Sequence, residues 1–146
     1  MKRILLFTAM LFISLGVFAQ YVDLGLPSGT LWPSVNEGGD GTFYTYDEAI
    51  RNFGNKLPTK EQLQELKDKC TWTWTGSGYK VVGPNGNSIY LPAAGYRDCA
   101  DNVGLVGSHG CYWCSDDAYL LFFYSGEAGI VYGKRCVGHS VRLVQD

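Results

Sequence analysis

The residues of this 146-residue chain best suited to chemistry are its five cysteines, and two of them have the spacing of a redox pair. Tyr112 and Trp113 separate Cys111 from Cys114. In thioredoxin-like enzymes such a pair sits at a helix N-terminus, which lowers the thiol pKa. Here the neighbouring residues predict a strand, in which residues three apart point to opposite faces. We therefore expect two structural thiols that neither pair with each other nor share a metal.

The cysteines also supply candidate disulfides. Cys99 lies in a long loop that leads to Cys111, and Cys136 stands at the start of the last predicted strand. An exported chain can form disulfides, and an odd cysteine count leaves at least one thiol unpaired within the molecule. We predict up to two bridges drawn from Cys99, Cys111, Cys114 and Cys136, with Cys70 free.

No other catalytic or metal-binding constellation is visible in the sequence. No second Cys-x-x-Cys or His-x-x-x-His motif follows Cys114, so a zinc site is not expected. His109 and His139 are the only histidines, and neither has a nucleophile at an interpretable spacing. We predict no catalytic residue, metal or other cofactor.

The N-terminus predicts export. Lys2 and Arg3 precede an apolar stretch that closes at Ala19, the pattern of a secretory signal peptide over 1–19. The stretch is shorter than the roughly 20 residues of a membrane span. We expect 20–146 to be one mildly acidic domain, secreted or held in the periplasm or cell envelope, with no membrane span after cleavage. No basic patch marks it for nucleic acid.

Four runs near the C-terminus, rich in aromatic and β-branched residues, predict the sheet that must position Cys111 and Cys114. They span 110–115, 118–124, 129–132 and 137–144, and Gly, Ser, Asp and Glu separate them as turns require. We expect an antiparallel sheet with Trp113 as its largest buried side chain.

Two helices are predicted upstream. Thr-x-x-Glu at Thr45 and Thr-x-x-Gln at Thr59 fit capping boxes, which place helices near 46–53 and 60–69. The second helix carries an inward stripe of Leu63, Leu66 and Cys70.

Shorter strands are expected on either side of the helices. Asn-Gly between two apolar runs predicts a hairpin of 79–82 with 88–91. The long, poorly patterned segment 92–110 is predicted to be a loop without secondary structure of its own, and such loops often carry function. The other predicted strands cover 21–24, 30–32 and 71–75.

Five segments of the sequence together resemble one protein family. They are Tyr-Val-Asp-Leu-Gly-Leu-Pro-Ser-Gly-Thr-Leu-Trp at 21–32, Lys-Leu-Pro-Thr-Lys-Glu-Gln at 56–62, Cys-Thr-Trp-Thr-Trp at 70–74, Gly-Pro-Asn-Gly-Asn-Ser-Ile-Tyr-Leu-Pro-Ala-Ala-Gly-Tyr-Arg at 83–97, and an ending with Tyr-Trp at 112–113 and Gly-His-Ser-Val-Arg at 138–142. As a set they resemble the fibrobacter-type major paralogous domain, which is abundant in exported proteins of gut Bacteroidetes.

That family is similar to the C-type-lectin-like fold, which formylglycine-generating enzymes and retroelement-diversified bacterial binding proteins also use. The resemblance implies an α+β domain in which two helices flank a twisted antiparallel sheet with long loops. It fixes no ligand, because a fold does not dictate function. Calcium-binding lectins of this fold use a Glu/Gln-Pro-Asn/Asp turn and a Trp-Asn-Asp strand. The chain matches these only in part, at 83–85 and 113–117, and Gly83 removes one oxygen ligand.

The function that remains is binding. Tyrosines give rigid amphipathic contact area at low entropic cost, so we select candidate ligand contacts on adjacent strands and their turn, while expecting about half of the tyrosines to face the core. The candidates are Tyr112, Asp116, Asp117, Tyr119, Tyr124 and Tyr132. Arg142 is expected to be a structural, hydrogen-bonding arginine. We predict a non-enzymatic module for a glycan or protein partner. The alternative is a formylglycine-generating-enzyme-like oxidase that uses a cysteine pair including Cys111 or Cys114.

Overall fold

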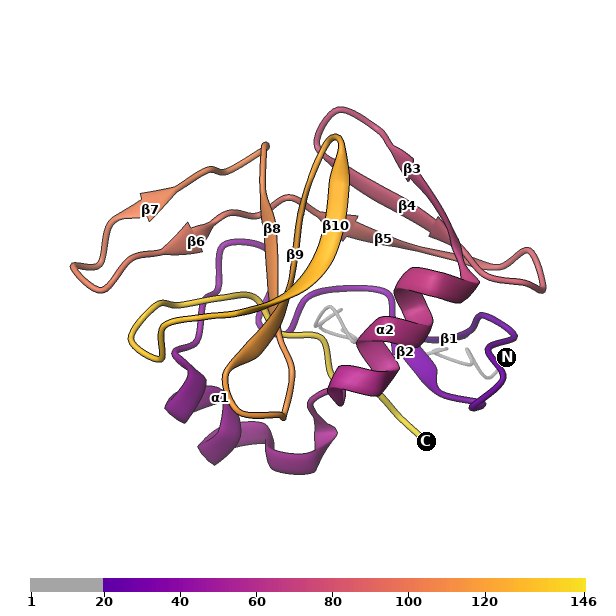
Figure 1. Cartoon of the computed structure of the whole chain (residues 1–146), viewed down its shortest axis with the longest axis horizontal. Helices are drawn as coiled ribbons and strands as arrows, with labels where there is room; N and C mark the ends of the chain where they lie inside the picture. Colours follow the sequence, from indigo (N-terminus) through magenta and orange to yellow (C-terminus); the bar gives the residue numbers. More distant parts are fainter. Residues whose placement is uncertain (1–19) are drawn as a thin grey trace, which may run out of the picture.

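The computed structural model describes residues 20–146, a mixed α+β domain in which every paired strand is antiparallel, as the sequence predicts (Figure 1). The predicted signal peptide falls on 1–19, outside the described residues. Within 20–146, no helix has the length and apolar character needed to cross a membrane. The elements are β1 (Tyr21–Asp23), β2 (Leu31–Pro33), α1 (Tyr46–Phe53), the 3-10 turn η1 (Gly54–Lys56), α2 (Lys60–Lys69), β3 (Thr71–Trp74), β4 (Gly78–Val82), β5 (Ser88–Pro92), β6 (Tyr96–Arg97), β7 (Val103–Gly104), β8 (Gly110–Trp113), β9 (Tyr119–Tyr124) and β10 (Glu127–Tyr132).

The sheet β10-β9-β8 has one helix on each face (Figure 1). Alternation along β9 sends Leu121 to one face and Leu120 to the other. Leu121 shares a core cluster with Leu66 of α2, whereas Leu120 shares a second cluster with Ala49 of α1. The predicted arrangement of two helices flanking an antiparallel sheet is therefore present.

Both helices begin where the capping patterns place them. Thr59 and Gln62 form a complete capping box, in which each side chain accepts a hydrogen bond from the other residue's backbone N–H. Thr45 accepts from the backbone N–H of Glu48, but its hydroxyl donates to the Glu48 carboxylate, so this box is only half formed. α1 ends at Gly54 with φ +52°, a conformation that glycine adopts without strain.

The sheet β3-β4-β5 packs its aromatic face against the central sheet. The rings of Trp72 and Trp74 meet Tyr79 edge to face, and Tyr79 meets Phe123 of β9 in the same way. The Asn-Gly turn joins β4 to β5, and the hairpin predicted there is confirmed.

Two of the sequence predictions are wrong in the C-terminal half. The run 137–144 is not a fourth strand, because successive residues bridge to different segments: Gly138 to Arg97, His139 to Tyr44, and Ser140 to Tyr112. The segment 92–110 is not structureless, since β6 and β7 pair within it as a short hairpin.

Trp113 is fully buried, as predicted, and its indole N–H donates to the carbonyl of Tyr44 at 2.7 Å. The two ends of the described chain meet at β2. Its residues pair with β1 on one side, and Leu31 exchanges backbone hydrogen bonds with Gln145.

Candidate functional site

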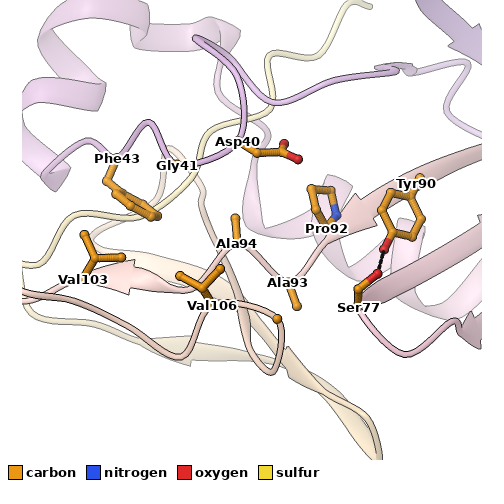
Figure 2. A pocket seen from close by; sticks show the side chains of 11 residues that line it. Asp40, Gly41, Phe43, Ser77, Tyr90, Pro92, Ala93, Ala94, Val103 and Val106 are labelled. Carbon is orange, nitrogen blue, oxygen red and sulfur yellow. Dashed lines mark hydrogen bonds between the residues drawn. The ribbon is translucent and has the colours of Figure 1, made fainter.

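The described domain has a cleft of about 460 Å³. It lies between the loop at 40–43, the turn that joins β3 to β4, the end of β5 with the residues that follow it, and β7 with the loop after it. Figure 2 shows Phe43 and Val103 toward one end of the cleft, Ser77 and Tyr90 toward the other, and the two alanines between them. The lining residues are Asp40, Gly41, Phe43, Ser77, Tyr90, Pro92, Ala93, Ala94, Val103, Val106 and Gly107.

The floor of the cleft is fixed by hydrogen bonds from the core and the flanking loops. The buried Tyr112 hydroxyl donates to the Pro92 carbonyl at 2.7 Å. The Ala93 N–H donates to the Ser77 carbonyl, and the Ala93 carbonyl accepts from the Gly107 N–H at 2.7 Å. Because the alanines after Pro92 have small side chains, the tightly held backbone leaves open space above it.

Gly95 lets the β6–β7 hairpin approach this floor. Its φ is +74°, and a Cβ added there would collide with the carbonyl oxygen of Gly104. A larger residue would push β7, and with it the wall of the cleft, outward.

Arg142 lies in the core and hydrogen-bonds β5, the strand whose end lines the cleft. Its guanidinium donates to the carbonyls of Tyr90 at 2.5 Å and Pro33 at 2.7 Å, and to the side-chain oxygen of Asn36 at 2.6 Å. It is 2% exposed, and burial lowers its pKa. No carboxylate within 20–146 lies at ion-pair distance from it. Arg142 thus has the structural hydrogen-bonding role expected of it.

The far wall of the cleft is tied to the C-terminal segment by a disulfide between Cys99 and Cys136. Beside it, Arg97 of β6 exchanges backbone hydrogen bonds with Gly138. These links hold the β6–β7 hairpin, whose following loop carries the exposed side chain of Val106.

The disulfide prediction is confirmed for Cys99 and Cys136 and wrong for Cys111 and Cys114, which are free and buried. The physical reason is burial: both thiols lie in the core, whereas Cys99 and Cys136 are exposed and bonded to each other. The predicted free thiol, Cys70, is free.

The free thiols are poorly suited to nucleophilic chemistry. Burial raises the pKa of Cys111 to about 12 and that of Cys114 to about 11, so both stay protonated near neutral pH. The buried His139 has its pKa lowered to about 4, and its Nδ1 makes no hydrogen bond within the described chain. Between residues 20 and 146, no group of three or more His, Cys, Asp or Glu side chains could hold a metal ion.

Asp116, Asp117, Tyr119 and Tyr132 lie together at one end of β9, whereas Tyr112 and Tyr124 lie elsewhere. None of the predicted ligand-contact residues lines the cleft. Tyr112 is 1% exposed, so its selection as a ligand contact is wrong: its side chain is part of the core. Tyr119 and Tyr124 stand at the two ends of the six-residue β9, about 17 Å apart at the strand rise. Tyr124 hydrogen-bonds Glu127, whereas Tyr119 packs edge to face on the exposed Tyr132.

The two aspartates have internal partners. Asp116 accepts a 2.6 Å hydrogen bond from the backbone N–H of Lys60, the first residue of α2, whose positive end favours a carboxylate. Asp117 lies 3.5 Å from Arg135. Contact of these aspartates and of the remaining tyrosines with a ligand stays a prediction.

Sequence reasoning missed the residues that line the cleft. One usable signal was present: Val103, Leu105 and Val106 are apolar side chains in a segment otherwise rich in glycine and polar residues, and all three are exposed. Apolar residues in such a loop, with no alternation to bury them, indicate a contact surface. Asp40 and Phe43 carried no comparable signal.

Comparison with known proteins identifies no relative. No family model, no curated protein and no solved structure matches the chain. The functional argument therefore rests on the geometry of the cleft and of the thiols.

Proposed function

We propose that this chain is a secreted, non-enzymatic binding module with a C-type-lectin-like fold, which recognises a glycan or protein partner at the cell envelope. The observation that carries the proposal is the cleft beside the β6–β7 hairpin. Its wall presents Val103 and Val106 at 55% and 67% exposure, on a loop secured by a disulfide. Concave apolar surfaces built from loops on a rigid scaffold are the usual form of a binding site.

The C-type-lectin-like architecture is supported by two features beyond the α+β class. Helices α1 and α2 cover opposite faces of the central antiparallel sheet. The long segment between β5 and β8 forms one wall of the cleft, in keeping with the variable long loops of that fold.

Export is supported by the disulfide. Cys99 and Cys136 are both exposed, and surface disulfides persist mainly in oxidising compartments such as the periplasm or the extracellular space. This agrees with the signal peptide predicted at the N-terminus.

Binding is favoured over oxidase chemistry by the positions of the thiols. A cysteine-pair oxidase needs two thiols close together and open to substrate. Cys111 and Cys114 lie in different core clusters, and neither lines the cleft.

The proposal is tested by comparing binding with the cleft intact and altered. The protein, its Val106→Asp variant and the control Val131→Asp would be applied to a glycan array and to envelope extracts. Val131 is 41% exposed on β10 and lies outside the cleft lining. We expect binding signals that are lost in Val106→Asp and kept in Val131→Asp. Signals indifferent to Val106→Asp would contradict a role for the cleft.

A further inference from the structure

The lining of the cleft has few groups that could form hydrogen bonds with the hydroxyls of a sugar. A pyranose brings several hydroxyls, and each one buried without a partner is costly. The side-chain hydroxyls of Ser77 and Tyr90 bond each other at 2.7 Å and so compete for any such ligand. The rest of the lining is largely aliphatic or aromatic: Phe43, Pro92, Ala93, Ala94, Val103 and Val106.

Of the two aromatic side chains of the cleft, only Tyr90 is exposed, at 37%. Phe43 is only 8% exposed, so little of its ring can be presented to a ligand. The hydroxyl end of Tyr90 is held by Ser77, and Thr75 Oγ1 lies 3.3 Å from the same oxygen. The most exposed apolar side chains of the lining are Val103 and Val106 of the opposite wall, at 55% and 67%, and their shape suits an aliphatic group.

One charge borders this apolar surface. Asp40 is the only charged residue of the lining, and it forms no ion pair with any residue in 20–146. The nearby cation Arg142 is buried and already hydrogen-bonded to three oxygens. The carboxylate of Asp40 is thus available to a positive group on a ligand.

We propose that the cleft takes an aliphatic side chain of a polypeptide whose adjacent residue is lysine or arginine, the aliphatic group lying against Ala94 and Val106 and the cation facing Asp40. This rests on the proposed binding function and selects a protein partner over a glycan.

The test is a nuclear magnetic resonance titration of the isotope-labelled protein with three probes. These are acetyl-Leu-Arg-amide, acetyl-Leu-Glu-amide and methyl β-glucoside. The Leu-Arg probe should shift the signals of Ala93, Ala94, Val103 and Val106, and bind about 5-fold more tightly than Leu-Glu at low salt, since a surface pair of opposite charges adds only modest affinity. High salt should shrink that ratio.

Two variants with matched controls separate the apolar and charged contributions. Asp40→Asn should erase the preference for Leu-Arg, whereas Asp68→Asn, on the exposed face of α2, should keep it. Val106→Thr should weaken both peptides, whereas Val131→Thr should not.

Equal binding of the two peptides would overturn the charge assignment. Glucoside shifts at the cleft without peptide shifts would overturn the inference while leaving a binding function in place. If none of the three probes shifts the signals of the cleft and Val106→Asp leaves partner capture unchanged, both the inference and the proposed function fail.

Discussion

Replacing Cys99 and Cys136 with serine should destabilise the domain by about 4 kcal/mol. The bridge joins residues 37 apart, and loop-closure entropy gives about 3 kcal/mol for a 15-residue loop and about 4.7 kcal/mol for a 100-residue loop. Both cysteines are exposed, so serine at either position adds little burial cost. Against a usual total of about 5–15 kcal/mol, this is a large share of the stability.

Urea unfolding followed by tryptophan fluorescence measures this loss. With a denaturant slope of about 2 kcal/mol per molar, the midpoint should fall by about 2 M. Reductant should lower the midpoint of the unmodified protein to that of the double variant, and should leave the variant unchanged. A loss below about 1 kcal/mol, or a further effect of reductant on the variant, would refute the reasoning.

The bridge should also order the wall of the cleft, because it anchors the β6–β7 hairpin. In the double variant, backbone amides around Val103 and Val106 should exchange with solvent faster, while those of Leu121 in β9 keep their protection relative to the global stability. Uniform change across both regions would show that the disulfide acts only on the unfolded chain.

Three further predictions concern buried groups. Arg142→Met should cost at least about 3 kcal/mol by urea unfolding, because it removes the guanidinium donor from Asn36 Oδ1 and from the carbonyls of Pro33 and Tyr90. Arg51→Met on the surface should stay within about 0.5 kcal/mol, and equal effects of the two substitutions would contradict this. Cys111 should react with iodoacetamide at pH 8 more than about 100-fold more slowly in the folded than in the urea-unfolded protein, since burial raises its pKa to about 12; equal rates would contradict its burial. His139, whose pKa burial lowers from 6.5 to about 4, should contribute stability that is present above pH 6.5 and lost, by about 3 kcal/mol, as the pH falls to 4. His139→Asn should reduce this loss of stability at low pH, and His109→Asn should leave it unchanged. If the stability of His139→Asn depends on pH as that of the unmodified protein does, the assignment to His139 is contradicted.

Local signals in the sequence predicted the local elements well. The capping residue Thr59 and the Asn-Gly turn each depend on neighbours within a few positions, so they determine α2 and the β4–β5 hairpin without knowledge of the rest of the chain. The alternation across β8 likewise predicted that Cys111 and Cys114 would face different parts of the core.

Predictions that depended on distant contacts were less successful. The run 137–144 has the composition of a strand, but its successive residues bridge to separate segments at Arg97, Tyr44 and Tyr112, so no continuous ladder forms. The segment instead crosses the core and pairs with several elements in turn.

The cleft could not be predicted because its lining comes from four separate stretches of the sequence: 40–43, Ser77, 90–94 and 103–107. These stretches meet through contacts that no local pattern encodes, among them the Tyr112 hydrogen bond to Pro92, the approach of Gly104 to Gly95, and the hydrogen bond from Gly107 to Ala93. The tyrosines chosen from the sequence have suitable chemistry but lie elsewhere, and one of them supports the floor from inside the core.

The measurement that tests the central claim most directly is the affinity of a purified partner for three proteins: the unmodified chain, Val106→Asp and Val131→Asp. If the cleft is the binding site, an aspartate in its wall should weaken binding by at least about 10-fold, because an apolar contact then meets an unpaired charge. The β10 substitution should change affinity by less than about 2-fold. Equal affinities for all three proteins would contradict the claim that this cleft binds the partner.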